Sequence, residues 1–251
     1  MTGFVTAINN NGITTITFYH PQSNSLPAAI LAQLTTAIHN ANTDTLCKVI
    51  ILKSEGDKTF CAGASFTELT AIQTEAEGLT FFSGFAHVIN AIRTCSKFVI
   101  GRVQGKAIGG GVGLASSCDY TVATQQAAIK LSELAVGIGP FVVGPAVERK
   151  IGTAAAYELA IDATNFRSAE WAMQKGLYTN VYTTIAEMDI AIHNLATTLA
   201  QSNPEAMAHI KKAFWNGTQH WDTLLIDRAK ISGSLVLSQF TINAIAQFKA
   251  K

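Results

Sequence analysis

The stretch Gly105-Lys106-Ala107-Ile108-Gly109-Gly110-Gly111-Val112-Gly113-Leu114 lies between two runs, at 98–103 and 120–123, whose apolar residues predict strands. It follows the first strand and opens a predicted short helix. Backbone N–H groups at a helix N-terminus have no partner within the helix and lie at the positive end of its dipole. Since glycine has no side chain, a ligand could approach the main chain closely at this point.

A second turn of small residues, Phe60-Cys61-Ala62-Gly63-Ala64-Ser65, occupies the same kind of position between a strand and a helix. Two such turns facing each other could direct two N–H donors at one oxygen atom, which is the geometry of an oxyanion hole. The alternative is that the glycines only allow a helix to pack tightly on a strand. A glycine motif by itself leaves both interpretations open.

Spacing excludes three other glycine-dependent sites. A phosphate-binding P-loop requires Ser or Thr after its Gly-Lys pair, where this chain has Ala107. A dinucleotide fingerprint requires Gly or Ala at its sixth position, where this chain has Leu114 or Ser116. The GxSxG turn of serine hydrolases is absent from the sequence.

Patterns of apolar residues on either side of these turns predict an α/β fold with a buried sheet. No low-complexity linker interrupts the chain, so we expect one folded unit with a helix-rich C-terminal third. The predicted strands are 4–8, 13–19, 49–52, 98–103, 120–123 and 181–182. The predicted helices are 30–38, 81–92, 154–161, 168–175, 185–199, 204–215 and 221–237.

The composition excludes several classes of protein. Hydrophobic residues make up 48% of the 251 residues and charged residues only 14%, which is the reverse of a disordered chain. The net charge is +1 without a basic block, so nucleic acid is not an expected partner. The uncharged stretch 231–248 contains Ser, Gln, Thr and Asn throughout and does not resemble a membrane span. The low charge suggests instead that self-association hides part of the surface.

The four cysteines form no CxxC pair and predict reduced, buried thiols of a cytoplasmic protein. The N-terminal residues have neither the basic nor the apolar region of a signal peptide. The six histidines show no metal-ligand spacing, so no metal site is expected.

Glu133 is a lone carboxylate in an apolar segment, Ala128 to Pro140. Burial there would raise its pKa toward the range in which it can both accept and donate protons. A helix-capping or salt-bridged glutamate is the alternative interpretation.

Five segments in this order resemble the crotonase, or enoyl-CoA hydratase/isomerase, family over nearly the whole chain. They are Pro21…Asn24-Ser25-Leu26, Phe60-Cys61-Ala62-Gly63-Ala64, Gly105…Gly109-Gly110-Gly111, Cys118-Asp119 and Ser132-Glu133. The resemblance implies a spiral of ββα units over 1–195 and an α-helical trimerisation region over 196–251. It also implies a homotrimer or a dimer of trimers, in which the stretch 231–248 would form an amphipathic helix at the interface between subunits.

The resemblance further implies an acyl-CoA thioester as substrate and no separate cofactor. The thioester oxygen would lie between the N–H groups of Ala64 and Gly110, and Glu133 would be the base. The CoA portion would be bound near four other residues, namely Leu26, Ala62, Phe66 and Gly109. The resemblance thereby implies a role in fatty-acid or branched-chain amino-acid degradation.

Two residues depart from the family pattern. Gly113 stands where many hydratases have a first catalytic glutamate, and Ser65 stands where an aspartate is frequent. With one of the two glutamates replaced, a single-glutamate site is expected. The segments 131–138, 141–143 and 149–152 look most like those of bacterial 3-methylglutaconyl-CoA hydratases, and this resemblance implies a hydratase acting on a substrate like 3-methylglutaconyl-CoA. The alternatives are a Δ3-Δ2-enoyl-CoA isomerase, a 3-hydroxyacyl-CoA hydrolase and a non-catalytic acyl-CoA-binding protein. A substrate with a second carboxylate would require a cation near its acyl end, for which Arg149 and Lys150 are candidates, although a solvated helix face is the alternative.

Overall fold

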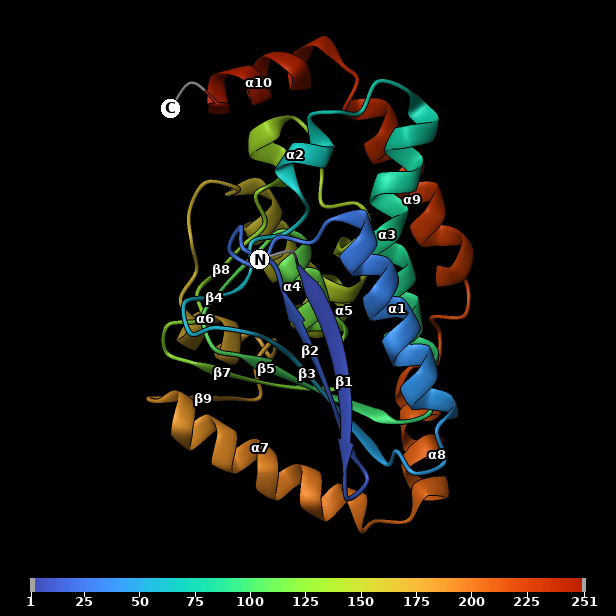
Figure 1. The fold of residues 1–251 in the computed structure, drawn as a ribbon. Helices are drawn as coiled ribbons and strands as arrows, with labels where there is room; N and C mark the ends of the chain where they lie inside the picture. Colours follow the sequence, from blue (N-terminus) through green and yellow to red (C-terminus); the bar gives the residue numbers. More distant parts are fainter. Residues whose placement is uncertain (1–2, 250–251) are drawn as a thin grey trace.

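Six strands form the main sheet of the computed structural model, which describes residues 3–249 (Figure 1). The strands lie in the order β1 (Phe4–Asn10), β2 (Ile13–Tyr19), β3 (Val49–Ser54), β5 (Phe98–Val103), β7 (Tyr120–Thr124) and β9 (Asn180–Tyr182). β1 and β2 are an antiparallel hairpin, and every other neighbouring pair is parallel. The central strands are buried on both faces, as their continuous apolar runs predict.

A second, smaller sheet places the two glycine turns side by side. It consists of three parallel strands, β4 (Thr59–Cys61), β6 (Lys106–Ile108) and β8 (Ile129–Lys130). Each of these strands follows a strand of the main sheet and is followed by helical chain. The repeated passage from main sheet to small sheet to helix is the expected spiral of ββα units.

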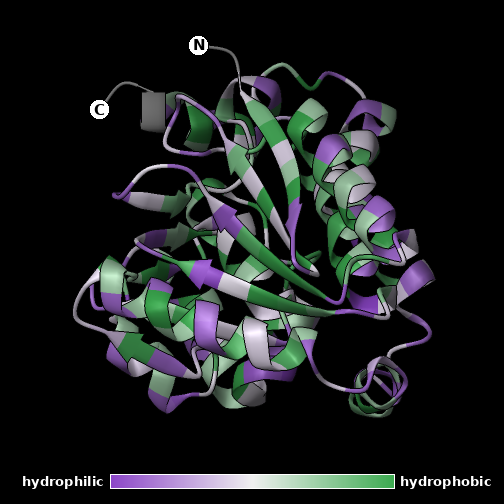
Figure 2. Cartoon of the chain, turned by 60° about the horizontal axis from the view of Figure 1, so that its bottom comes forward, coloured by the Kyte–Doolittle hydropathy of each residue, from purple (hydrophilic) through white to green (hydrophobic). Residues whose placement is uncertain are grey.

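The helices cover the main sheet on both faces (Figures 1 and 2). The larger core includes apolar side chains of α1 (Ala28–Thr43), α3 (Glu75–Thr94), α4 (Gly110–Ser117), α5 (Gly144–Ile161) and α9 (Trp221–Leu235). α7 (Ile185–Ala200) packs on the opposite face, where Met188 and Ile192 contact Val49, Ile100 and Val122. The other helical segments are α2 (Phe66–Leu69), η1 (Glu133–Val136), α6 (Ala169–Gln174), α8 (Pro204–Phe214) and α10 (Gln239–Lys249).

Local sequence signals determine where two of the long helices begin. Thr74 before α3 accepts a hydrogen bond from the Glu77 N–H, and the Glu77 carboxylate accepts one from the Thr74 N–H. Thr184 and Glu187 form the same capping box at the start of α7. These reciprocal bonds satisfy N–H groups that a helix leaves free.

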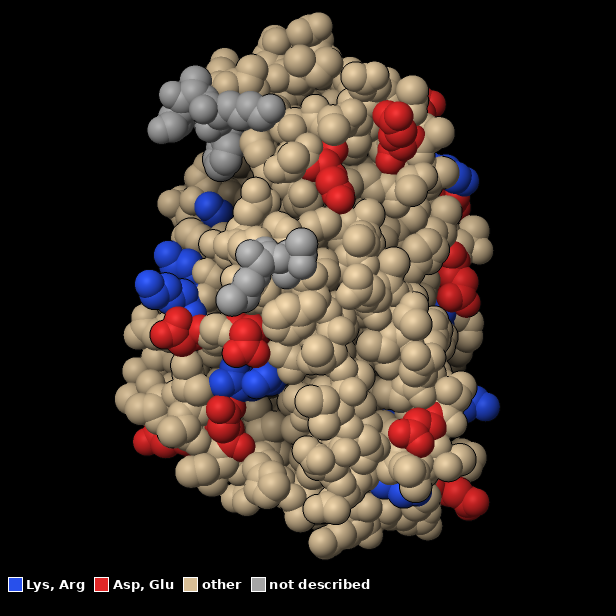
Figure 3. All heavy atoms as spheres, viewed as in Figure 1, with Lys and Arg blue, Asp and Glu red and all other residues tan. Residues whose placement is uncertain are grey.

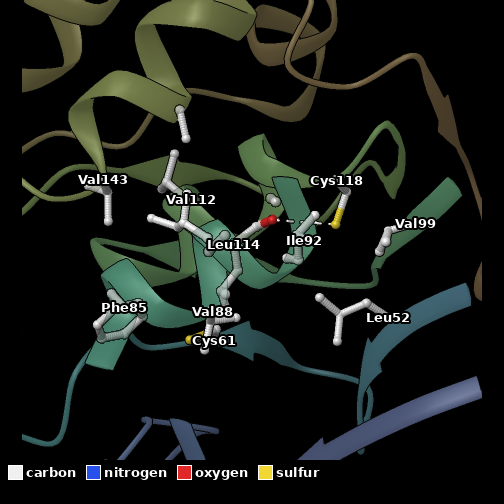
Figure 4. Close-up of a cluster of buried hydrophobic side chains, with 14 of the residues drawn as sticks. Leu52, Cys61, Phe85, Val88, Ile92, Val99, Val112, Leu114, Cys118 and Val143 are labelled. Atoms are coloured by element: carbon white, nitrogen blue, oxygen red, sulfur yellow. Dashed lines mark hydrogen bonds between the residues drawn. The ribbon is translucent and has the colours of Figure 1, made fainter. Parts of the chain in front are cut away.

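α4 lies at the centre of the larger core (Figure 4). All eight of its residues are buried, and Phe85 and Val143 lie beside its first turn, which contains Val112. The Cys118 thiol after its last turn donates a hydrogen bond to the Leu114 carbonyl at 3.4 Å. The glycine-rich helix is therefore held rigidly by side chains from neighbouring elements.

The prediction of one amphipathic helix over 231–248 is wrong. α9 ends at Leu235 and α10 begins at Gln239, so a turn divides the segment into two helices. The predicted division between residues 195 and 196 falls inside α7, and residues 1, 2, 250 and 251 of the two predicted parts lie outside the described residues. In residues 3–249, no helix is long and apolar enough to cross a membrane.

Candidate active site

The two glycine turns are in direct contact at the end of the small sheet. A side-chain carbon added to Gly63 would lie 3.0 Å from the Ile108 carbonyl oxygen and 3.5 Å from the Gly110 nitrogen. One added to Gly111 would lie 2.6 Å from the Cys61 carbonyl oxygen. Gly63 and Gly109 both have positive φ angles, of 90° and 53°, which glycine adopts without strain. Glycine is therefore required at these positions, both for the conformation of the turns and for the close approach of the two main chains.

Two backbone N–H groups remain free where these turns meet. Leu26 pairs with the first turn by donating its N–H to the Gly63 carbonyl at 2.8 Å and accepting from the Ser65 N–H at 3.3 Å. Ala64, between them, therefore directs its own N–H away from Leu26. Gly110 is the first residue of α4, so its N–H has no partner in the helix. Within residues 3–249, neither the Ala64 nor the Gly110 N–H donates a hydrogen bond.

The ring of Phe85 in α3 packs against the second turn at Gly110. A side-chain carbon at Gly110 would lie 2.2 Å from two ring carbons of Phe85, which is itself 5% exposed. Only glycine fits between this ring and the first turn. In the sequence, Phe85 lies within the predicted helix 81–92, and no pattern there indicates this contact.

The Glu133 carboxylate lies against the second turn. Gly109 donates its N–H to the Lys130 carbonyl at 2.8 Å, which ties the turn to the strand just before Glu133. A carbon added to Gly109 would lie 3.0 Å from Glu133 Oε1. The residue is half-buried as a whole, yet Oε2 is buried and has no hydrogen-bond partner in the described part of the chain. A buried, unpaired carboxylate oxygen is unusual in a folded protein and is consistent with a functional group.

Burial raises the pKa of Glu133 from 4.5 to about 7. Desolvation of the ionised form is the main cause, and hydrogen bonds from the backbone of Glu133 and Ser132 oppose it. A carboxyl group with this pKa can accept a proton and return it at neutral pH.

An apolar wall replaces the second carboxylate. A side-chain carbon at Gly113 would lie 2.4 Å from Cγ1 and 2.7 Å from Cβ of Val143, the residue before α5. Figure 4 shows Val143 beside α4. Gly113 lies one helical turn after Gly109, so Val143 contacts α4 one turn away from the point that Glu133 contacts. The position at which many members of the resembled family have a first glutamate is therefore filled by a valine side chain.

α10 supports the turn that carries Glu133. Gly137 ends η1 in the left-handed conformation, and its N–H donates to the Glu133 and Leu134 carbonyls. The buried Thr241 hydroxyl donates to the Gly137 carbonyl at 3.0 Å. A side-chain carbon at Gly137 would lie 2.5 Å from Thr241 Oγ1 and 2.8 Å from a ring carbon of Phe240. Sequence reasoning missed this contact, because it joins residues 104 positions apart.

The other predicted binding residues gather at the first turn. Leu26 is fully buried and contributes its backbone, and Ala62 donates its N–H to the Ser23 carbonyl at 3.2 Å. Phe66 begins α2 and is half-buried. The structure thus brings Leu26, Ala62 and Phe66 together beside Ala64.

The two candidate cations have structural partners elsewhere. The Arg149 guanidinium lies 3.9 Å from the centre of the Trp215 ring and donates to the Phe214 carbonyl at 2.6 Å. The Lys150 ammonium donates to the Asp119 carbonyl at 3.2 Å. Both side chains are engaged in packing between helices.

Known proteins share this fold and sequence pattern. The probable enoyl-CoA hydratase of Bacillus subtilis is 28% identical over 241 residues, covering 95% of this chain and 93% of that protein. The mitochondrial methylglutaconyl-CoA hydratase of Rattus norvegicus is 33% identical over 200 residues, covering 78% of this chain and 63% of that protein. A solved enoyl-CoA hydratase structure from Bacillus halodurans has a TM-score of 0.89 at 22% identity, covering 97% of this chain and 99% of that chain.

These similarities confirm the crotonase fold expected from the sequence. The family model described as enoyl-CoA hydratase/isomerase matches residues 8–230. With that match spanning most of the chain, the protein belongs to the enoyl-CoA hydratase/isomerase family of enzymes.

Proposed function

We propose that this protein is an enoyl-CoA hydratase that acts on a short, branched or unsaturated acyl-CoA, with 3-methylglutaconyl-CoA as the favoured substrate, and works with one glutamate. The observation that carries the proposal is the buried Glu133 carboxylate beside two free N–H groups, with a pKa of about 7 and an unpaired oxygen. The thioester oxygen would accept hydrogen bonds from Ala64 and Gly110. These donors stabilise the negative charge that develops on this oxygen in the transition state.

In hydration, Glu133 removes a proton from water while the water oxygen bonds to C3 of the enoyl group. The electron pair of the double bond moves toward C2, and the thioester becomes an enolate held by the two N–H groups. Glu133 then returns its proton to C2. One water molecule is added, and the carboxylate is regenerated without any cofactor beyond the CoA of the substrate.

Isomerisation of a 3-enoyl-CoA is the second candidate, and Val143 favours it. With Val143 filling the position of a second carboxylate, Glu133 is the one family carboxylate left to hold an attacking water molecule. In isomerisation, Glu133 takes a proton from C2, the double bond moves into conjugation, and the proton is delivered to C4. This reaction needs one carboxylate and no water.

Three readouts separate these reactions. Loss of the absorbance of a conjugated enoyl-CoA indicates hydration, and a gain of that absorbance from a 3-enoyl-CoA indicates isomerisation. Free CoA detected with a thiol reagent indicates hydrolysis. We expect hydration, with 3-methylglutaconyl-CoA preferred over crotonyl-CoA. Binding of both thioesters without any of the three signals would refute an enzymatic role and support the non-catalytic alternative.

The CoA portion would lie along the first turn, near Leu26, Ala62 and Phe66, with Gly109 closing the other side of the thioester. We also propose a homotrimer or a dimer of trimers. Exposed apolar side chains on the helical half of the chain support self-association; Tyr157, Ile161 and Phe240 are 63%, 70% and 72% exposed. Light scattering would give three or six times the chain mass, and a monomer would refute this assembly.

A cytoplasmic location remains a prediction. The four cysteines are free and buried, which agrees with a reducing compartment.

The surface reflects the low charge of the sequence. Charged side chains are sparse on the face shown in Figure 3, and broad uncharged areas remain between them.

A further inference from the structure

A cavity of about 490 Å³ lies next to the loop that carries Glu133, between α5 and α9. Leu131 and Pro140, which lie before and after Glu133 in the sequence, form one edge of it. Phe141, Val147 and Tyr157 continue its apolar wall. A volume of this size is typical of small-molecule sites, in which a few polar groups lie among apolar side chains.

Arg228 of α9 places a cation in this cavity. It is half-buried, and its Nη1 lies 3.5 Å from the Phe141 carbonyl oxygen. Each of the other arginines has a strong partner: Arg93 and Arg102 each pair with an aspartate, Arg167 pairs with two carboxylates, and Arg149 stacks on a tryptophan. Within residues 3–249, Arg228 forms no ion pair, so its guanidinium can bind an anion.

Glu148 is the other charged side chain at the cavity. It is exposed to solvent and accepts a hydrogen bond from the Thr153 hydroxyl at 2.7 Å. It does not lie within ion-pair distance of Arg228. An incoming carboxylate would therefore not have to displace Glu148 from the guanidinium.

Two consecutive residues, Val143 and Gly144, lie between α4 and the Arg228 guanidinium. Val143 lies against α4 at Gly113, one helical turn from the end that Glu133 contacts. The next residue, Gly144, is the one whose added side-chain carbon would lie 3.6 Å from Arg228 Nη1. The Arg228 guanidinium therefore lies beside the residue that follows Val143, the side chain that packs against Gly113.

We propose that this cavity, which we call the Arg228 pocket, binds the distal carboxylate of a short dicarboxylyl-CoA. The inference rests on the proposed acyl-CoA chemistry and specifies its substrate class. A guanidinium presents parallel N–H groups that match both oxygens of a carboxylate, and the bonds are strengthened by charge. The apolar wall would contact the carbon atoms between the thioester and the carboxylate.

The test is the affinity for two saturated thioesters that cannot be hydrated, measured by calorimetry. Glutaryl-CoA is butyryl-CoA with a carboxylate in place of a terminal hydrogen atom. We expect the protein to bind glutaryl-CoA more tightly than butyryl-CoA. Arg228→Met should weaken the binding of glutaryl-CoA about 30-fold, equivalent to ~2 kcal/mol at 1.36 kcal/mol per tenfold change. The affinity for butyryl-CoA should stay unchanged.

Two variants serve as controls. Arg228→Lys retains the charge without the planar fork and should lose less affinity for glutaryl-CoA than Arg228→Met does. Glu148→Gln removes the other charge at the pocket and should not weaken glutaryl-CoA. Because butyryl-CoA is measured on every variant, general damage to the fold would reduce both affinities together.

Equal effects of Arg228→Met on the two thioesters, or no effect on either, would overturn the inference. A change in oligomer mass without a change in the affinity ratio would also overturn it, since Arg228 would then serve an interface between copies of the chain. Failure of the proposed function is a separate result, because it is the absence of turnover of both 3-methylglutaconyl-CoA and crotonyl-CoA by the unaltered protein.

Discussion

Replacing Glu133 by glutamine should inactivate the protein and change how its stability depends on pH. The folded state raises the pKa of this carboxyl group from 4.5 to about 7, so it favours the protonated form. The stability that the group contributes is therefore complete below pH 4.5 and is lost as the pH rises through 7. Glutamine has a similar shape and does not titrate.

The magnitude follows from the two pKa values. Between pH 5 and pH 8, the linkage relation gives a loss of about 2.5 kcal/mol from the free energy of unfolding for this one group. The amide of Glu133→Gln carries a fixed cost of burial that does not vary with pH. From pH 5 to pH 8, the free energy of unfolding of the variant should therefore rise by about 2.5 kcal/mol relative to that of the unaltered protein.

Urea denaturation of both proteins at pH 5 and pH 8, at one protein concentration, measures this shift. All other titrating groups are common to the two proteins, so their contributions cancel in the difference. A shift near zero would refute the argument that Glu133 is desolvated in the folded state. A shift of the opposite sign would mean that the folded state stabilises the ionised carboxylate.

Three further predictions concern two glycines with no space for a side chain and one threonine that supplies a single hydrogen bond. Gly113→Ala should lower the free energy of unfolding in urea by about 1–3 kcal/mol by overpacking, and adding Val143→Ala should recover part of the loss; no loss would contradict the close contact. Thr241→Val should lower kcat and cost about 1 kcal/mol of stability by removing the hydroxyl that supports η1, whereas equal damage from Thr241→Ser would contradict that role. Gly78→Ala should lower the melting temperature by several degrees, because the added carbon would lie 2.7 Å from Gly233 Cα of α9, and an unchanged value would contradict this helix crossing.

The sequence was sufficient for the features that depend on local pattern. Apolar, β-branched runs predicted the strands of the main sheet, and the glycine turns and Glu133 were recognised from residue type and neighbours. The strands of the small sheet contain two or three residues each, too few to show an alternation. The turn between α9 and α10 contains Val236, Leu237 and Ser238, and no glycine or proline marks it in the sequence.

The supporting contacts of the site could not be predicted, because each joins distant parts of the chain. Thr241 reaches Gly137 across 104 positions, and Arg228 reaches Phe141 across 87. Nothing near Gly113 in the sequence indicates that Val143 fills the space beside it. The same limit explains why Arg149 and Lys150 were candidates for substrate binding, although the fold engages both elsewhere.

The central claim is that the Glu133 carboxylate carries the proton in an acyl-CoA reaction, and the pH profile of enoyl-CoA turnover tests it most directly. For hydration of 3-methylglutaconyl-CoA or crotonyl-CoA, kcat/KM should rise with an apparent pKa of about 7 as Glu133 ionises in the free enzyme. Glu133→Gln should lower turnover at least about 100-fold at every pH. Turnover of Glu133→Gln close to that of the unaltered protein would contradict the claim.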